Sequence, residues 1–243
     1  MPDRIADIEK ALSEIRDSAG KSKPAATAGP SKSFALKRYL RGSLIVVVAA
    51  LVPFLLLIKL SVWMYLEMQV PAYAALGVGA TGVLLLLIVY SAIVSYRISG
   101  RLRVSSRLGK ALGALVAVFC CYSLLFISAG NVKTEAVRST YTSLHPLLRL
   151  AVSTLVIADG DAVVTDAARS REDYARMGLP VNERSLHFRQ RSGYVHAVDL
   201  RTNDRAKFRN ALVSWYFKAM GFTTLRHVGT ADHLHVSLPV PQK

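Results

Sequence analysis

Three long apolar segments constrain what this chain can fold into. They cover residues 43–65, 72–96 and 111–128, and each approaches or exceeds the roughly 20 residues needed to cross a bilayer. They also explain why 52% of the chain is hydrophobic although its formal charge is +15. The sequence therefore predicts a membrane domain of three transmembrane helices over residues 43–130.

Two features of the first segment are compatible with a membrane span. Pro53 is tolerated in a lipid-embedded helix when neighbouring groups satisfy the freed carbonyl, and Lys59 can extend its ammonium to the interface. Buried helices of a soluble core are the alternative. The uncharged length of the second segment, which includes the run from Val83 to Tyr90, favours membrane insertion.

The distribution of basic residues predicts the orientation. Short loops rich in lysine and arginine stay on the cytoplasmic side of a membrane. Residues 67–71, between the first two segments, include no basic residue. We therefore expect a multi-pass protein with a cytoplasmic N-terminus and a C-terminal domain outside the cytoplasm. The basic residues that flank the segments are Lys32, Lys37, Arg38 and Arg41, then Arg97, Arg101, Arg103, Arg107 and Lys110.

Residues 1–42 are predicted to be a cytoplasmic amphipathic helix followed by a basic linker. Ile5, Ile8, Leu12 and Ile15 have helical spacing within residues 2–19. Residues 20–33 have the composition of a solvated linker. Basic residues next to spans set topology and contact anionic membrane lipid. No nucleic-acid-binding motif accompanies them, so we expect no nucleic-acid partner.

Residues 131–243 predict an α+β domain with a small, mostly antiparallel sheet. Helical patterns cover residues 141–157, 166–174 and 204–220, and strand patterns cover 162–165, 194–200 and 233–238. Gly221 is placed to end the last helix. Helices and strands do not alternate strictly, which is typical of an α+β fold. The apolar residues at helical spacing in 204–220 are expected to be core: Phe208, Leu212, Trp215, Tyr216 and Ala219.

The last sixty or so residues of this domain have five of the six histidines of the chain. Side chains alternate along a strand, so His233 and His235 are expected on one face, where a metal ion would satisfy two imidazoles that are costly to bury. Imidazole nitrogen and carboxylate oxygen are zinc ligands. The sequence therefore predicts that His187, Asp199 and His235 bind Zn²⁺. Both cysteines, Cys120 and Cys121, lie in the third apolar segment, so thiolates of the domain cannot contribute.

These residues resemble a known pattern. Ser185-x-His187, Ala197-x-Asp199 and the late His235 are similar to the zinc D-alanyl-D-alanine carboxypeptidases, in the wider group of lysostaphin-type metallopeptidases. Ala168-Arg169-Ser170 is similar to the arginine-containing segment that precedes the first ligand in that family. The resemblance covers roughly residues 155–238 and implies a zinc peptidase domain.

The resemblance also implies roles for individual residues. Arg169 and Ser185 would contact the substrate, with Arg169 holding a carboxylate or the developing oxyanion. The general base is Asp232 if the chain is carboxypeptidase-like, or His233 if it is endopeptidase-like. Residues 188–192 lengthen the interval between His187 and Asp199, which leaves His196 as an alternative first ligand.

The expected function is a membrane-anchored zinc metallopeptidase that hydrolyses peptidoglycan stem peptides or cross-links, in the bacterial inner membrane with its C-terminal domain periplasmic or extracellular. Two alternatives belong to other classes. One is a non-catalytic binding or scaffold protein that keeps the peptidase fold. The other is a small transporter or channel subunit, which the near absence of ionisable residues other than Lys59 in the spans disfavours.

Overall fold

The computed structural model describes residues 3–20, 32–176, 178, 180–229 and 232–241. The chain divides into two compact units, Met1–Val48 and Ala49–Lys243. In the first unit, the helix predicted over residues 2–19 is confirmed as α1 (Asp3–Gly20). Most of the predicted linker lies outside the described residues.

The three predicted apolar helices are confirmed as α2 (Lys32–Leu66), α3 (Ala72–Ser99) and α4 (Ser106–Leu125). Each is long and apolar enough to cross a membrane. Helix α3 ends at Gly100, which has a φ of 69°. Helix α4 begins earlier than its apolar segment because the Ser105 hydroxyl accepts a hydrogen bond from the Leu108 amide at 3.2 Å.

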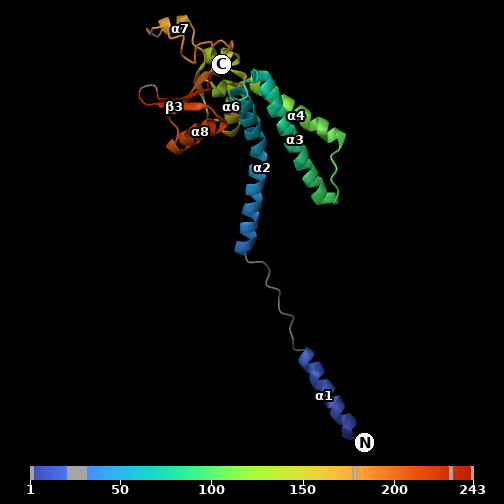
Figure 1. The fold of residues 1–243 in the computed structure, drawn as a ribbon. Helices are drawn as coiled ribbons and strands as arrows, with labels where there is room; N and C mark the ends of the chain where they lie inside the picture. Colours follow the sequence, from blue (N-terminus) through green and yellow to red (C-terminus); the bar gives the residue numbers. More distant parts are fainter. Residues whose placement is uncertain (1–2, 21–31, 177, 179, 230–231, 242–243) are drawn as a thin grey trace. The chain divides into compact units, whose positions relative to one another are not determined.

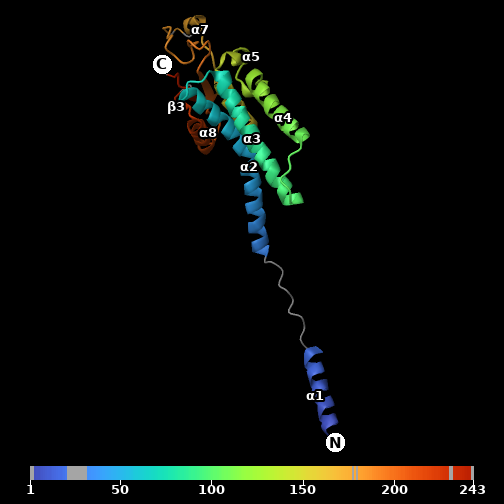
Figure 2. The ribbon, with the colours of Figure 1, turned by 45° about the vertical axis from the view of Figure 1, so that its right-hand side comes forward.

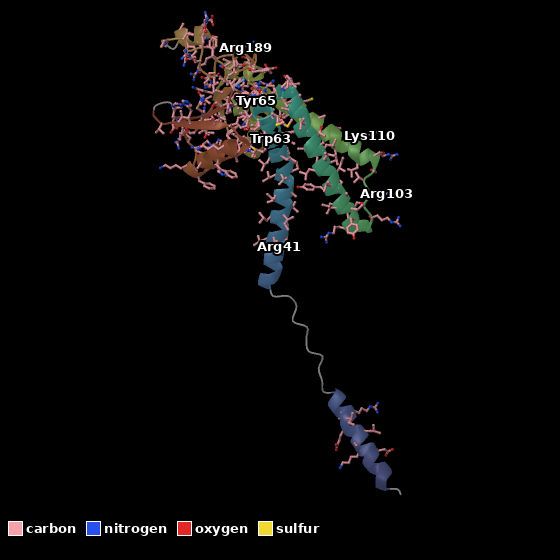
Figure 3. The ribbon with its side chains drawn as sticks, in the orientation of Figure 1. Arg41, Trp63, Tyr65, Arg103, Lys110 and Arg189 are labelled. Carbon is pink, nitrogen blue, oxygen red and sulfur yellow. The ribbon has the colours of Figure 1, made fainter. Side chains whose placement is uncertain are left out.

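Small residues let the apolar helices approach one another. At Gly79 of α3, a β-carbon would lie 2.8 Å from the Leu57 carbonyl oxygen of α2 and 2.1 Å from the Ser61 hydroxyl. Helices α3 and α4 lie side by side as a hairpin (Figures 1 and 2). Figure 3 shows Arg103 and Lys110 at the connected end of this hairpin, whereas Tyr65 lies towards the C-terminal domain.

The C-terminal domain is built on an antiparallel sheet of four strands within the described residues. They are β1 (Val164–Asp166), β2 (Ala197–Arg201), β3 (Thr223–His227) and β4 (His233–Ser237), in the order β1-β2-β4-β3. The helices are α5 (Glu135–Ser139), α6 (Pro146–Ala158), α7 (Arg171–Arg176) and α8 (Lys207–Met220), with short 3₁₀ turns at Ala129–Asn131 and Tyr141–Ser143. The predicted α+β class with a small antiparallel sheet is confirmed.

The two faces of the sheet have different neighbours. Leu200 of β2 and Leu234 of β4 point to one face, where they meet Leu155 of α6 and Val213 of α8 around a small gap. Strand alternation directs Asp199 and His235 to the opposite face. The hydrophobic core therefore lies between the sheet and helices α6 and α8, and the candidate ligands lie on the face away from these helices.

Polar contacts join the domain to the end of α4. The Tyr141 hydroxyl donates to the Ser123 carbonyl oxygen at 2.9 Å, and the buried Arg149 guanidinium donates to the Leu124 carbonyl oxygen. The last carbonyls of a helix lack partners within the helix and are attracted to cations. The domain and the helices also share one hydrophobic core, which includes residues of α2, α3 and α4. The predicted boundary near residue 130 is not a break in packing.

Three parts of the prediction for the domain were wrong. The helix predicted over residues 166–174 begins only at Arg171, as α7, because Asp166 is the last residue of β1. Strand β3 was not predicted, because Thr223–His227 is largely exposed and has a single aliphatic residue, Leu225. The expectation that all the apolar residues of 204–220 are core fails for Phe208, Leu212 and Trp215, whose exposed fractions are 75%, 51% and 66%. The buried positions of α8 are instead Asn210, Val213, Phe217 and Met220.

Gly221 is predicted to be necessary for the contact between α8 and α2. Its φ is 102°, and a β-carbon there would lie 2.9 Å from Val62 Cγ1, a branched side chain that cannot easily move. We expect Gly221→Ala to lower the free energy of unfolding by about 2 to 4 kcal/mol, from backbone strain plus overpacking. The measurement is thermal and denaturant unfolding of the full chain in detergent.

Gly193→Ala is the matched control. Gly193 also has a positive φ, 81°, but a β-carbon there has no neighbour within 4 Å among the residues that the structure describes. We therefore expect Gly193→Ala to lower the free energy of unfolding by the backbone strain alone, about 1 to 2 kcal/mol. Equal destabilisation by the two substitutions would contradict a close contact at Gly221.

A buried histidine should make stability depend on pH. Burial, His196 and Arg149 together lower the pKa of His145 from 6.5 to about 3. Because the unfolded chain binds this proton more tightly, stability is fully present above pH 6.5 and is lost as the pH falls towards 3, by up to about 1.4 kcal/mol per pH unit for this group. His145→Asn should give a shallower slope in unfolding measured between pH 7 and 4, since asparagine can cap α6 but does not titrate. An unchanged slope would contradict the assignment.

Candidate metal centre

Pairing of β2 with β4 brings two of the predicted ligands together. Asp199 and His235 are direct cross-strand partners in this antiparallel pair, so their side chains leave the same face of the sheet close to each other. The distance between Asp199 Oδ1 and His235 Nδ1 is 2.9 Å. The backbone register alone therefore places one carboxylate beside one imidazole.

The third predicted ligand comes from the loop before β2. His187 is almost fully buried, and its Nε2 lies 3.2 Å from both Asp199 Oδ1 and His235 Nδ1. The loop is fixed by hydrogen bonds from the Arg169 amide to the His187 carbonyl oxygen at 3.0 Å and from the His187 amide to the Ser185 hydroxyl at 3.3 Å. His187, Asp199 and His235 thus form a group that could hold a metal ion.

The dimensions of this group suit zinc. Zinc–nitrogen and zinc–oxygen bonds of about 2.0 to 2.1 Å in a tetrahedron give donor separations of about 3.3 Å. The three separations here are 2.9, 3.2 and 3.2 Å. One carboxylate and two imidazoles are also the donor types of a catalytic zinc site with an open position.

The orientation of the His187 ring is set by a second hydrogen bond. His187 Nδ1 lies 2.7 Å from the Ala167 carbonyl oxygen, which can only accept a hydrogen bond. In the neutral imidazole, Nδ1 therefore has the proton, and the lone pair of Nε2 points to Asp199 and His235. Such a contact fixes the tautomer required of a metal ligand.

Asp199 is ionised in this setting. Burial of the carboxylate raises its pKa, but when His187 Nε2 and His235 Nδ1 carry protons, the hydrogen bonds that they donate outweigh burial and hold the pKa below its ordinary value. Its second oxygen, Oδ2, lies 3.3 Å from Arg169 Nη2. One carboxylate oxygen therefore faces the two histidines and the other faces the arginine.

Arg169 lies at the cluster, next to Asp199. Its Nε donates to Asp166 at 2.6 Å in addition to the contact with Asp199. The side chain is 25% exposed, so the guanidinium is held from two sides while part of it reaches the surface. Asp166 was not predicted as a site residue; its position at the end of β1, three residues before Arg169, is the signal that could have identified it.

The two candidate bases have different surroundings. His233 Nε2 lies 3.6 Å from Asp199 Oδ2, next to the cluster. Asp232 instead pairs with Arg226 at 2.8 Å and accepts a hydrogen bond from Thr202. Hydrogen bonds from Arg226 and Thr202 lower the pKa of Asp232 to about 2.

The structure does not bring His196 to the cluster. His196 lies three residues before Asp199. Because side chains alternate along an extended segment, an odd separation directs these two to opposite faces of the sheet. His196 is fully buried beside His145, and its Nε2 lies 2.8 Å from the Ser192 hydroxyl. Ser185 supports the loop through the His187 amide.

The residues that lengthen the interval between His187 and Asp199 form a turn. The Gln190 amide donates to the Tyr194 carbonyl oxygen at 2.9 Å, and the His196 amide returns to the Leu186 carbonyl oxygen at 2.9 Å. The extra residues therefore do not separate the two ligands.

His227 is a further histidine near the cluster. Its ring stacks on that of His233 with a centroid distance of 4.8 Å. It was missed because β3, which places it there, was not predicted.

No family model, curated protein or solved structure matches this chain.

The three donors are predicted to bind one zinc ion per chain. His235→Ala should reduce zinc in the purified full chain to background, because the two remaining ligands are too few for a stable site. The measurement is elemental analysis after dialysis against a weak chelator. His227→Ala is the matched control, since His227 is a neighbouring histidine outside the donor group, and it should retain zinc. A wild-type chain that folds but binds no zinc would contradict the site.

Proposed function

We propose that this protein is a membrane-anchored zinc hydrolase that cuts amide bonds in peptidoglycan stem peptides or cross-links. The observation that carries the proposal is the convergence of His187, Asp199 and His235, with the tautomer of His187 fixed by Ala167. Zinc bound there would supply a Lewis acid that makes hydroxide available at neutral pH. The peptidoglycan substrate rests on the resemblance to the D-alanyl-D-alanine carboxypeptidases.

His233 is the better candidate for the general base. A base that acts near neutral pH needs a pKa near that pH, whereas the pKa of Asp232 is about 2 and its oxygens are engaged by Arg226 and Thr202. His233 lies beside Asp199 with a side chain that is 24% exposed. This arrangement supports the endopeptidase-like assignment, in which the first histidine of His-x-His takes the proton of the attacking water and returns it to the leaving amine.

Arg169 is proposed to orient the substrate. A guanidinium has five N–H donors, so the contacts with Asp166 and Asp199 leave donors for a substrate carboxylate or carbonyl oxygen. The same contacts restrict its rotation, which favours binding in one geometry.

The charge pattern supports placement of the site outside the cytoplasm. Within the second unit, Arg103 and Lys110 lie at the end of the α3–α4 hairpin away from Tyr65 (Figure 3), and α6 packs against α3 and α4. Because basic loops remain cytoplasmic, the domain would face the periplasm or the exterior of a bacterial inner membrane.

His233→Gln is predicted to lower kcat for hydrolysis of purified muropeptides by about 10²- to 10⁴-fold, the usual contribution of a general base, while zinc content stays unchanged. Asp232→Asn is the matched control and should cost less than about tenfold, because it alters a surface ion pair. Mass spectrometry of the products identifies the bond that is cut. Equal losses in the two variants would contradict the assignment of the base.

Zinc binding without hydrolysis of any muropeptide would contradict the enzyme itself. If such a chain still bound muropeptide, the non-catalytic alternative would be supported.

A further inference from the structure

Helix α8 has two apolar faces. Val213, Phe217 and Met220 pack into the domain core. On the other side, Phe208, Leu212 and Trp215 have the i, i+4, i+7 spacing of one helical stripe and are exposed by 75%, 51% and 66%. A contiguous stripe of large apolar side chains is rarely left in water and marks a contact surface.

The C-terminal end of α8 adjoins an apolar span. A β-carbon at Gly221 would lie 2.9 Å from Val62 and 4.0 Å from Leu66. Val62 lies one helical turn before the end of the candidate span Tyr39–Leu66. Helix α8 also lies beside the neighbouring part of α2 in both ribbon views (Figures 1 and 2). For a span that ends at Leu66, this contact sets the end of α8 near the level where the hydrocarbon of a bilayer meets the headgroups.

The side chains of this surface suit that level. Tryptophan is enriched at membrane interfaces, where its ring is apolar and its N–H remains hydrated. Lys207 and Lys218 are exposed on α8 and flank the stripe, and lysine side chains there can reach anionic phosphates. Trp63, next to Val62 on α2, is 47% exposed and labelled in Figure 3.

We infer that α8 is an interfacial helix whose Phe208, Leu212 and Trp215 side chains insert among the acyl chains of the adjoining phospholipid leaflet. Continuity with the span at Val62 identifies lipid as the occupant of this surface. Because α8 packs on the Leu234 and Val236 face of the sheet, insertion turns the opposite face, with Asp199 and His235, away from the bilayer. This inference does not depend on catalysis.

The two tryptophans of the chain allow a direct test. The full chain with Trp63→Phe is reconstituted into vesicles of phosphatidylcholine and phosphatidylglycerol with bromine on acyl carbons near the headgroup or near the chain end. We expect the shallow bromines to reduce Trp215 emission about twofold or more and the deep bromines to reduce it less, as for an interfacial helix. Acrylamide in the buffer should quench it weakly.

Phe208→Ser with Leu212→Ser in the same background is the matched variant. Both positions are exposed, so the fold should be retained, which circular dichroism checks, while quenching by brominated lipid decreases. Quenching of Trp215 by acrylamide and not by lipid would overturn the inference by showing a hydrated surface. Emission protected from both quenchers would also overturn it and would indicate cover by a second copy or another protein.

Discussion

The pairing of β2 with β4 is the interaction on which the candidate site depends. Its register sets Asp199 opposite His235 on one face and Leu200 opposite Leu234 on the other. A slip of one residue would exchange the faces, exposing leucine and burying a carboxylate. The same register that assembles the hydrophobic core therefore assembles the donors, and the core on the helix side stabilises the position of the polar groups on the other side.

The sequence predicted the structure correctly where the pattern of apolar residues is compatible with only one arrangement. Three apolar segments predicted three apolar helices, and the alternation around His235 predicted which residues share a face. Helix α8 shows where this reasoning stops. With apolar stripes at both Phe217 and Trp215, helical spacing cannot tell which stripe meets the core, since that depends on the position of the sheet and of α2.

Residues of the site that were missed share a physical reason. Asp166 and His227 reach the cluster through the sheet, and neither is adjacent in sequence to the ligands. Strand β3 is at an edge of the sheet, where exposed polar residues replace the apolar alternation that predicts a strand. The Ala167 carbonyl, which fixes the His187 tautomer, is a backbone group and has no signature in a sequence.

The contacts of Tyr141 and Arg149 with the last carbonyls of α4 restrict the movement of the site relative to the apolar helices. A domain on a flexible linker can take any position within reach of its anchor, and the length of the linker sets that reach. Here the domain and the span ends share one core, so the cluster keeps a constant height relative to the apolar helices. If these helices span a bilayer, the cluster moves only parallel to the membrane, at a distance from it that the length of the helices sets.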